Sequence, residues 1–282
     1  MKLPFADDMP QPLRSIGRGL LTKSARRYVA ASLERLAHLQ DYRDPLFRRS
    51  QRQLVALKNK FRGESCIIIG NGPSIRGQDL RALSFAKTFC LNRGYLMWRE
   101  QGVAPDFFVA VNDLVIEQFD NEIASLPCPL FLPWRHHQRF RGVGNAIFLE
   151  MRWKEQFFRD ITKGLWPGAT VTAAALQIAY HLGFSRAILI GVDHRYSASG
   201  APNAEVVQTQ SDDSHFSSDY FGKGVRWNLP DLEKSEIAYR FAKTVFEADG
   251  RTIIDATSGG ALDIFPKMPL SDAMRLCRRP AG

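Results

Sequence analysis

Polar residues stand where the apolar, strand-like runs of this sequence stop. The run at residues 66–70 continues into the turn Gly70-Asn71-Gly72-Pro73-Ser74, the next two runs end in Asn92 and Asn112, and the run at 186–193 closes on Asp193. Glycine lets a backbone approach a phosphate or sugar closely, and asparagine can donate to a phosphate or ribose without adding negative charge. Together these residues predict a nucleotide site, because ligands of open α/β sheets bind at the carboxyl ends of strands.

The turn at residues 70–74 is not a known phosphate loop. No Gly-Lys-Ser/Thr follows it, and Ile75 stands where the last glycine of a GxGxxG pattern would be. Taken alone it is equally well explained as a plain tight turn, so the prediction depends on Asn92 and Asn112.

Histidines supply the second set of candidates. His215 closes the string Asp212-Asp213-Ser214-His215 inside a long polar stretch, and a histidine beside carboxylates can act as a general base. A solvated loop side chain is the other interpretation. His136 and His137 are adjacent and lack an obvious third ligand, so no metal is expected there. His194 fits a functional group or a loop donor equally, and His38 and His181 fall on expected helices and are predicted to be structural.

Strands and helices alternate from residue 64 onward, which predicts a single Rossmann-like α/β domain with a mostly parallel sheet. The run at 186–193 is apolar on both faces, and the helix expected at 171–182 has Thr170 as its cap and Gly183 at its end. The polar insertion at 194–230 is long enough to be a lid or binding loop. Strands are expected at 66–70, 88–92, 106–112, 130–133, 146–150, 186–193 and 250–256, and helices at 79–83, 95–100, 114–125, 171–182 and 232–247.

The net charge of +9 is confined to one end of the chain. Residues 1–63 hold 14 of the 38 basic residues and 5 of the 29 acidic ones, so the rest of the chain is neutral. This pattern argues against a nucleic-acid partner, which would require a basic folded domain. We expect a basic helical arm at 1–62, a catalytic domain at 63–267 and a C-terminal tail at 268–282.

Two roles for the arm remain open. Apolar residues recur at helical spacing within 24–40 and again after Pro45, with basic residues between them. The helices either dock on the domain or pair between the subunits of a homo-oligomer, or they attach the protein to an anionic membrane surface.

Composition indicates a cytoplasmic protein, with a peripheral position on the inner face of the membrane if the arm binds lipid. The start of the chain lacks an apolar signal segment, and no run of 18 apolar residues exists. The four cysteines lack CxxC spacing and fit free thiols in a reducing compartment.

These motifs, in this order, resemble the bacterial sialyltransferases of glycosyltransferase family 42. The resemblance is closer to the DUF115 family, which includes MptE-like 6-hydroxymethylpterin diphosphokinases and the central domain of Maf flagellin glycosyltransferases. It covers about residues 60–267 and rests on six segments: residues 69–74, Asn92, Asn112, 168–172, 191–194 with 213–224, and 256–260.

The sialyltransferase resemblance implies a CMP-sugar donor, a glycan or lipid-linked acceptor and no metal or other cofactor. By position, the turn that begins at Gly70 would hold phosphate and donor through Asn71, Gly72 and Ser74, and His215 would be the general base. Asn92 and Asn112 would contact the donor or ribose, Thr170 the donor sugar, and Asp193 the nucleotide. The family's leaving-group tyrosine is shifted in register here, and Arg195 and Tyr196 are the candidates to stabilise the leaving phosphate.

The diphosphokinase resemblance implies different chemistry on the same scaffold. It requires ATP, Mg²⁺ and transfer of pyrophosphate to a pterin hydroxyl, with the metal near Asp193, Asp212 or Asp213. A non-catalytic nucleotide-binding assembly protein is a third alternative. The sequence favours a glycosyltransferase of bacterial surface glycan synthesis that uses a nucleotide-activated, nonulosonate-like sugar.

Overall fold

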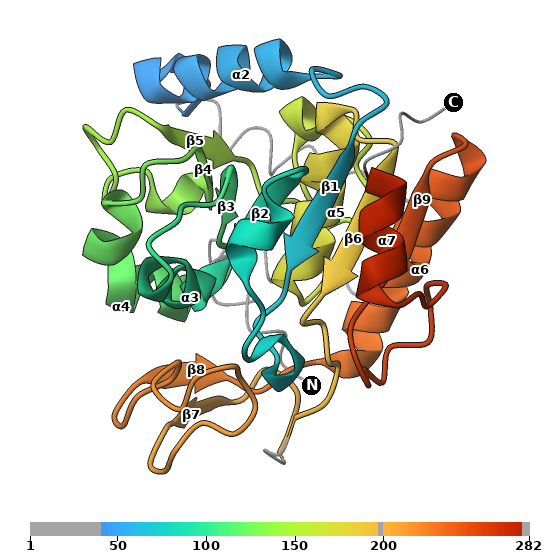
Figure 1. Ribbon diagram of the computed structural model, residues 1–282. Coiled ribbons are helices and arrows are strands. Elements are labelled where there is room, and N and C mark those ends of the chain that lie inside the picture. Colours follow the sequence, from blue (N-terminus) through green and yellow to red (C-terminus); the bar gives the residue numbers. More distant parts are fainter. Residues whose placement is uncertain (1–40, 197–199, 278–282) are drawn as a thin grey trace, which may run out of the picture. The chain divides into compact units, whose positions relative to one another are not determined.

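The computed structural model describes residues 41–196 and 200–277 (Figure 1). The chain divides into two compact units, Met1–Arg48 and Arg49–Gly282. Of the first unit, the described part is a 3₁₀ helix at Asp41–Arg43 and the beginning of α2 (Pro45–Leu57). The helix expected at 24–40, with His38, lies outside the described residues. The sheet lies in the second unit.

A seven-stranded, entirely parallel sheet forms the centre of this unit, which confirms the predicted α/β fold. Its strand order is β5-β4-β3-β2-β1-β6-β9, and β7 and β8 form a separate antiparallel ribbon. The sheet strands are β1 (Ser65–Ile69), β2 (Lys87–Leu91), β3 (Phe107–Val109), β4 (Leu130–Pro133), β5 (Ala146–Leu149), β6 (Arg186–Ile190) and β9 (Thr252–Asp255), and the ribbon strands are β7 (Glu205–Val207) and β8 (Arg226–Asn228).

The connecting helices cover both faces of the sheet, as parallel strands require. They are α3 (Tyr95–Glu100), α4 (Asp113–Ala124), α5 (Val171–Leu182), α6 (Leu232–Ala248) and α7 (Leu270–Cys277), with 3₁₀ helices at Pro73–Ile75, Leu80–Leu83, Asn92–Gly94, Trp134–His136 and Ile161–Lys163. The segment expected to form a helix at 79–83 is one of these 3₁₀ turns, and the expected C-terminal tail contains α7.

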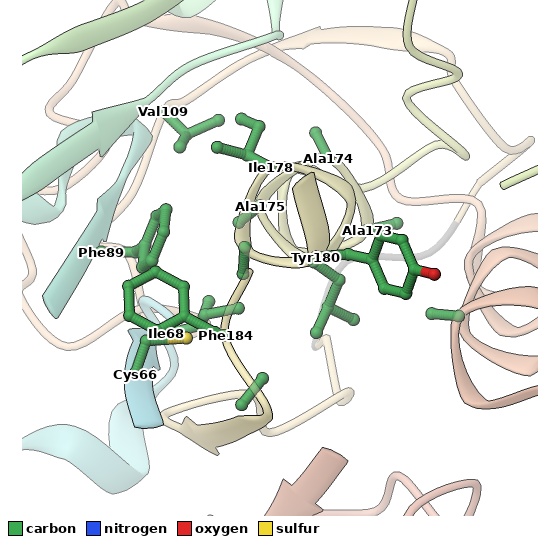
Figure 2. Close-up of a cluster of buried hydrophobic side chains, with 14 of the residues drawn as sticks. Cys66, Ile68, Phe89, Val109, Ala173, Ala174, Ala175, Ile178, Tyr180 and Phe184 are labelled. Atoms are coloured by element: carbon green, nitrogen blue, oxygen red, sulfur yellow. The ribbon is translucent and has the colours of Figure 1, made fainter. Parts of the chain in front are cut away.

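The alternation of side chains along the strands divides the core into two layers. Cys66 and Ile68 of β1 belong to the cluster that packs on α5 and α6, and Ile67 and Ile69 point to the other face, where the ring of Tyr95 lies 6.3 Å from that of Phe108. Figure 2 shows the first layer, in which Ala173 and Ala174 lie on other sides of α5 and Ala175 lies on the side that faces Phe89. Small side chains there let the helix approach the sheet closely.

Glycine ends α5 where the chain leaves no room for a side chain. Gly183 has φ +99°, and a Cβ on it would lie 2.7 Å from the Cα of Asn59. The backbone N–H groups of Asn59 and Phe61 donate to His181 and Leu182 at the end of the helix, both at 2.9 Å. Residues 49–61, which were expected to belong to the arm, therefore pack against the sheet and α5.

The long insertion lies beyond the carboxyl ends of the strands. Strand β6 stops at Ile190, three residues before the end expected from its apolar run, because Gly191 turns the chain at φ +68°. The β7–β8 ribbon that follows lies below the arrowheads of β1 and β6 (Figure 1). Within the described residues, none of the helices combines the length and apolar character needed to cross a bilayer.

Candidate functional site

The switch point of the sheet lies between β1 and β6. The chain runs outward from β1 to β5 and then returns to β6 on the other side of β1, which is where α/β sheets bind ligands. The loops after the two strands touch through their backbones, since Gly70 N–H donates to Ile190 O at 2.7 Å and Gly72 N–H to Gly191 O at 2.9 Å. A Cβ on Gly70 would lie 2.3 Å from Gly191 O, so this contact requires glycine.

Asp193 accepts hydrogen bonds from Ser74, the last residue of the glycine turn. Its carboxylate accepts the backbone N–H of Ser74 at 3.1 Å and the Ser74 hydroxyl at 2.6 Å. A Cβ on Gly72 would lie 1.9 Å from Asp193 Oδ2, so the second glycine makes room for the carboxylate. In this conformation the turn carries a negative charge at the position where the sequence predicted a phosphate.

Asn71 joins the end of β1 to the insertion. The side-chain Nδ2 of Asn71 donates to Leu91 O and to the Tyr220 hydroxyl, both at 2.9 Å. The backbone carbonyl of Asn71 accepts the N–H of Phe216 at 2.8 Å. The buried Oδ1 of Asn71 has no hydrogen-bond partner among the described residues, and the same holds for Oδ1 of Asn92. Unpaired buried acceptors cost free energy, so both oxygens are suited to receive N–H or O–H donors of a ligand.

A histidine–aspartate pair stands in the insertion. His215 Nδ1 lies 2.7 Å from Asp212 Oδ2, and Asp212 is 4% exposed. The same carboxylate accepts the N–H groups of Ser214 at 2.9 Å and Phe221 at 3.2 Å, which fixes its orientation. When Nδ1–H donates to a carboxylate, Nε2 carries the lone pair and can accept a proton, and no partner for Nε2 is found in the part of the chain that the structure describes.

Two arginines hold the insertion on the strand ends. Arg76 Nε donates to Phe216 O at 3.0 Å, and its Nη2 donates to His215 O at 2.9 Å. Arg93 Nη1 donates to the carbonyls of Asp219, at 3.1 Å, and Tyr220. The sequence analysis missed Arg76, Arg93 and Tyr220. Each arginine follows a strand-end turn and so was visible, but its partners lie more than 120 residues along the chain.

Asn112 and Thr170 act as helix caps. Asn112 Oδ1 accepts Val115 N–H at 3.2 Å at the start of α4, and Thr170 Oγ1 accepts Thr172 N–H at 3.3 Å at the start of α5. The Thr170 hydroxyl also lies 3.3 Å from that of Tyr239. Both side chains are therefore used by the fold, and ligand contact would add to that role.

Arg195 and Tyr196 line a cavity of about 300 Å³ beside the switch point. Its other walls are Pro73, Asp193, Asp213 and Ser214. His194, which precedes Arg195 in the chain, has φ +55°, and its Nε2 lies 3.3 Å from Glu236 Oε1. Positive φ is uncommon for residues other than glycine, and Asn92 and Ala169 near other strand and helix ends share it. The cavity joins both leaving-group candidates to Asp193 and Asp213.

The carboxylates expected to bind Mg²⁺ divide into two groups. Asp193 and Asp213 line the same cavity, whereas Asp212 is committed to His215. Mg²⁺ often takes only one or two protein carboxylates and completes its shell with phosphate oxygens. Among the described residues no group of three or more histidine, cysteine or acidic side chains is arranged to hold a metal.

The remaining described histidines have structural partners. His136 Nε2 lies 2.6 Å from Asp113 Oδ1; burial raises the pKa of that carboxyl, but the hydrogen bonds from His136 and Arg135 outweigh it and leave the pKa below its usual value. The ring of His137 stacks on that of Trp134, with centroids 3.9 Å apart, and its Nδ1 lies 2.8 Å from Trp134 O. His181 Nε2 bonds Leu54 O at 2.8 Å, as expected of a structural histidine.

Comparisons with known proteins give two findings. Residues 46–199, more than half of the chain, match the family described as 6-hydroxymethylpterin diphosphokinase MptE-like. Among solved structures, the Maf glycosyltransferase from Magnetospirillum magneticum AMB-1 is similar, with 15% identity and a TM-score of 0.48 over 82% of this chain. The chain spans 40% of the length of that glycosyltransferase. No curated protein matches.

Proposed function

The chain belongs to the MptE-like family, and from that premise we propose that it is a transferase that moves a group from a nucleotide-activated donor to an acceptor hydroxyl. The observation that carries the proposal is the Asp212–His215 pair, whose Nε2 is left available as a base. The pair is held against the ends of β1 and β2 by Asn71, Arg76 and Arg93.

We infer that the transferred group is a sugar. His215 Nε2 removes the acceptor hydroxyl proton while the acceptor oxygen bonds to the anomeric carbon, and the bond from that carbon to the nucleotide phosphate breaks. Asp212 stabilises the imidazolium that forms, and Arg195 and Tyr196 face the leaving phosphate. The order of motifs supports a CMP-linked, nonulosonate-like donor, whose hydroxyl and amino groups would find acceptors in Asn71 Oδ1 and Asn92 Oδ1.

The place of action is part of the same proposal. A surface glycan acceptor carried on a lipid would be presented at the cytoplasmic face of the membrane, and residues 1–62 supply the positive charge that attracts anionic lipid. Free cysteines at Cys66, Cys90 and Cys128, all buried, fit a reducing compartment.

A second candidate is pyrophosphate transfer from ATP to a pterin-type hydroxyl, as the family's description suggests. Asp193 and Asp213 on one cavity favour it, because they would hold Mg²⁺ together with phosphate oxygens; bound Mg²⁺ would neutralise charge developing on the phosphates. The family match ends at Ser199, before Asp212 and His215. We rank this candidate below sugar transfer because the order of the motifs, which includes Asp213 and His215, resembles that of the sialyltransferases.

Turnover assays separate these functions. The full chain is incubated with CMP-, CDP-, UDP- and GDP-sugars, and with ATP, Mg²⁺ and 6-hydroxymethylpterin, and products are measured by mass spectrometry. We expect sugar transfer with release of CMP, and His215→Ala should reduce the rate by about 10²–10⁴-fold. His137→Ala, in a histidine away from the site, serves as the matched control and should retain the rate.

Other outcomes identify the alternatives. Mg²⁺-dependent pyrophosphate transfer without nucleotide-sugar turnover would replace sugar transfer by the diphosphokinase function. Nucleotide binding without turnover, unchanged in His215→Ala, would indicate a non-catalytic assembly protein.

A further inference from the structure

We propose that the glycine turn and Asp193 form a site for the ribose of the nucleotide, in which the Asp193 carboxylate accepts hydrogen bonds from two neighbouring sugar hydroxyls. The inference rests on the proposed function, because it names the part of the donor that the switch point recognises. It replaces the expectation that the turn holds a phosphate. It also makes Asp193 the residue that selects a ribonucleotide over its 2′-deoxy form.

The turn has few hydrogen-bond donors left for a phosphate. A phosphate-binding turn offers several free backbone N–H groups to its ligand. Here such groups already donate within the protein: Gly70 to Ile190 O, Gly72 to Gly191 O, Ile75 to Gly72 O and Ser74 to Asp193. Pro73 has no N–H, and the Ser74 hydroxyl also donates to Asp193. The turn therefore presents acceptors to its ligand rather than donors.

The Asp193 carboxylate can accept further hydrogen bonds. Its Oδ1 accepts the Ser74 N–H at 3.1 Å, and its Oδ2 accepts the Ser74 hydroxyl at 2.6 Å. An ionised carboxylate has about four lone-pair sites, so each oxygen can take one more donor. Asp193 is half-buried and lines the cavity of about 300 Å³. Two adjacent hydroxyls of one ligand, as in ribose, match the two oxygens of this carboxylate.

The segment at residues 256–260 holds Asp193 in place from the other side. Thr257 Oγ1 accepts the N–H of Val192 at 3.1 Å, and the N–H of Ala261 donates to the backbone carbonyl of Asp193 at 2.9 Å. The carboxylate is therefore oriented before a ligand binds, which lowers the cost of binding. This contact also gives a role to a segment that the proposed reaction does not use.

The charges of the cavity favour hydroxyls at Asp193 and the phosphate at Arg195. Asp193 and Asp213 bring two carboxylates to the cavity wall, whereas Arg195 brings one cation. Carboxylates repel a phosphate but accept hydrogen bonds from hydroxyls. In a nucleotide the phosphate is bonded to the ribose, so a ribose on Asp193 leaves the phosphate in the cavity that Arg195 and Tyr196 also line. We therefore assign the two hydroxyls to ribose rather than to the transferred sugar.

Matched pairs of ligands test the site in the wild-type chain. Isothermal titration calorimetry in EDTA measures the affinity of the full chain for CMP and 2′-deoxy-CMP, and for ATP and 2′-deoxy-ATP. In the pair that binds, we expect the ribose form to bind about 10–100-fold more tightly, because the 2′-deoxy form lacks one hydrogen bond to a charged group. The second pair keeps the test valid for a chain that uses an adenine nucleotide.

Asp193→Asn separates ribose from phosphate by the sign of its effect. Asparagine can keep hydrogen bonds to Ser74, but it has too few acceptors for two hydroxyls. We expect CMP to bind about 10-fold more weakly, with less than about a threefold difference between CMP and 2′-deoxy-CMP. At a phosphate site, the loss of the negative charge would instead strengthen the binding of CMP and of inorganic phosphate.

The control is Asp219→Asn, an exposed aspartate of the insertion, which should bind CMP as the wild type does. An unchanged melting temperature shows that Asp193→Asn is folded. The ribose preference of the wild-type chain needs no variant at all.

Three results would overturn the inference: no preference for ribose in either pair, tighter CMP binding by Asp193→Asn, or a ribose preference that this variant retains. Binding of N-acetylneuraminate that Asp193→Asn abolishes, with equal affinities within the ribose pairs, would assign the two hydroxyls to the transferred sugar. Nucleotide binding that needs both Mg²⁺ and Asp193, without a ribose preference, would assign this carboxylate to the metal.

The site and the proposed function can fail separately. Sugar transfer without a ribose preference would retain the function and remove Asp193 from nucleotide recognition. A ribose preference that depends on Asp193, in a chain that transfers no sugar, would retain the site and remove the function.

Discussion

Three aspartates near the carboxyl edge of the sheet have different partners, and those partners decide what each carboxylate can do. Asp193 accepts two hydrogen bonds from Ser74, and Asp212 binds Nδ1 of His215. Asp255, the last residue of β9, is 1% exposed, and its Oδ2 has no hydrogen-bond partner among the described residues. A carboxylate on an imidazole orients a base, whereas a buried carboxyl with one oxygen unpaired favours its protonated form.

Asp212 should be needed for turnover nearly as much as His215. In Asp212→Asn the amide can donate to Nδ1, which would place the imidazole proton on Nε2 and block it as a base. We expect the rate to fall by about 10²–10⁴-fold with the fold intact. Steady-state kinetics measures the effect, and Asp219→Asn, an exposed aspartate of the same insertion, is the control. Equal rates in the two variants would contradict the role of Asp212.

Asp255 should make the protein less stable as the pH rises. Burial raises the pKa of its carboxyl, although hydrogen bonds from Thr257 oppose the shift. The folded state therefore holds this proton more tightly than the unfolded chain, and the stability it contributes is present at acid pH and is lost as the pH rises through the raised pKa. In urea unfolding, we expect the free energy of unfolding of Asp255→Asn to rise relative to that of the wild type between about pH 4 and about pH 8.

Asp160 provides a control of opposite sign. Partial burial opposes the shift, but hydrogen bonds from Lys58 and Thr162 hold the pKa of this carboxyl at about 2. Its contribution to stability is present above the ordinary carboxyl pKa and is lost as the pH falls below that pKa toward about 2. Asp160→Asn should therefore lose stability relative to wild type as the pH rises. The same pH trend in both variants would contradict the assignment for Asp255.

At the scale of elements, the site depends on how closely β1 and β6 approach beyond their last residues. Gly70 and Gly191 bring two backbones together, and the following residues, Asn71 and Asp193, then face the insertion and the glycine turn. A side chain at either glycine would separate the strand ends and move both polar residues. Positive φ at Gly191 and His194 turns the chain sharply into the cavity.

Gly70→Ala should therefore be destabilising although its φ is ordinary. The new methyl group would meet the backbone of Gly191 at 2.3 Å, and a backbone cannot move aside as a flexible side chain can. We expect a loss of about 1–3 kcal/mol in the free energy of unfolding. Gly144→Ala, where a Cβ meets nothing within 4 Å, should stay within about 0.5 kcal/mol of wild type in the same denaturant titration. Equal effects would show that the close approach is not needed.

In the molecule as a whole, the excess positive charge and the candidate site lie in different parts of the chain. The excess of +9 lies in residues 1–63, whereas the candidate site uses residues from 70 to 220. Residues 49–61 of the basic stretch pack on the sheet through Leu54 and on α5 through Asn59 and Phe61, so part of the positive charge is carried by the folded unit itself. Most of the other basic residues of this stretch belong to residues 1–48, of which 1–40 lie outside the described residues.

Removing residues 1–40 should separate membrane attachment from stability. In a flotation assay, we expect a smaller fraction of the truncated chain to remain with vesicles that contain anionic lipid, because it loses seven of the basic residues. Its melting temperature and its turnover on a soluble acceptor should be unchanged. Neutral vesicles are the control. If the truncation lowers the melting temperature or changes the oligomeric state, the segment docks or pairs instead.

The fold could be predicted because its signals are local. The short apolar run at residues 186–190, followed by Gly191, favours a buried strand of a parallel sheet, and Thr170 and Gly183 mark the ends of α5 within its own sequence. Strand ends were predicted less well: β6 stops at Ile190 because Gly191 turns at positive φ, which an apolar pattern does not reveal. The C-terminal helix α7 was also missed.

The sequence by itself determined the parallel α/β architecture, the polar strand ends and the nomination of His215, because periodicity and residue type act over short distances. Only the tertiary structure decided which groups meet: Asp193 with Ser74, Asp212 with His215, and Tyr220 with Asn71. Asp212 and His215 are only three residues apart in the insertion, whereas the other two contacts join residues more than 100 positions apart. Such pairings arise from packing in three dimensions, which no local pattern encodes.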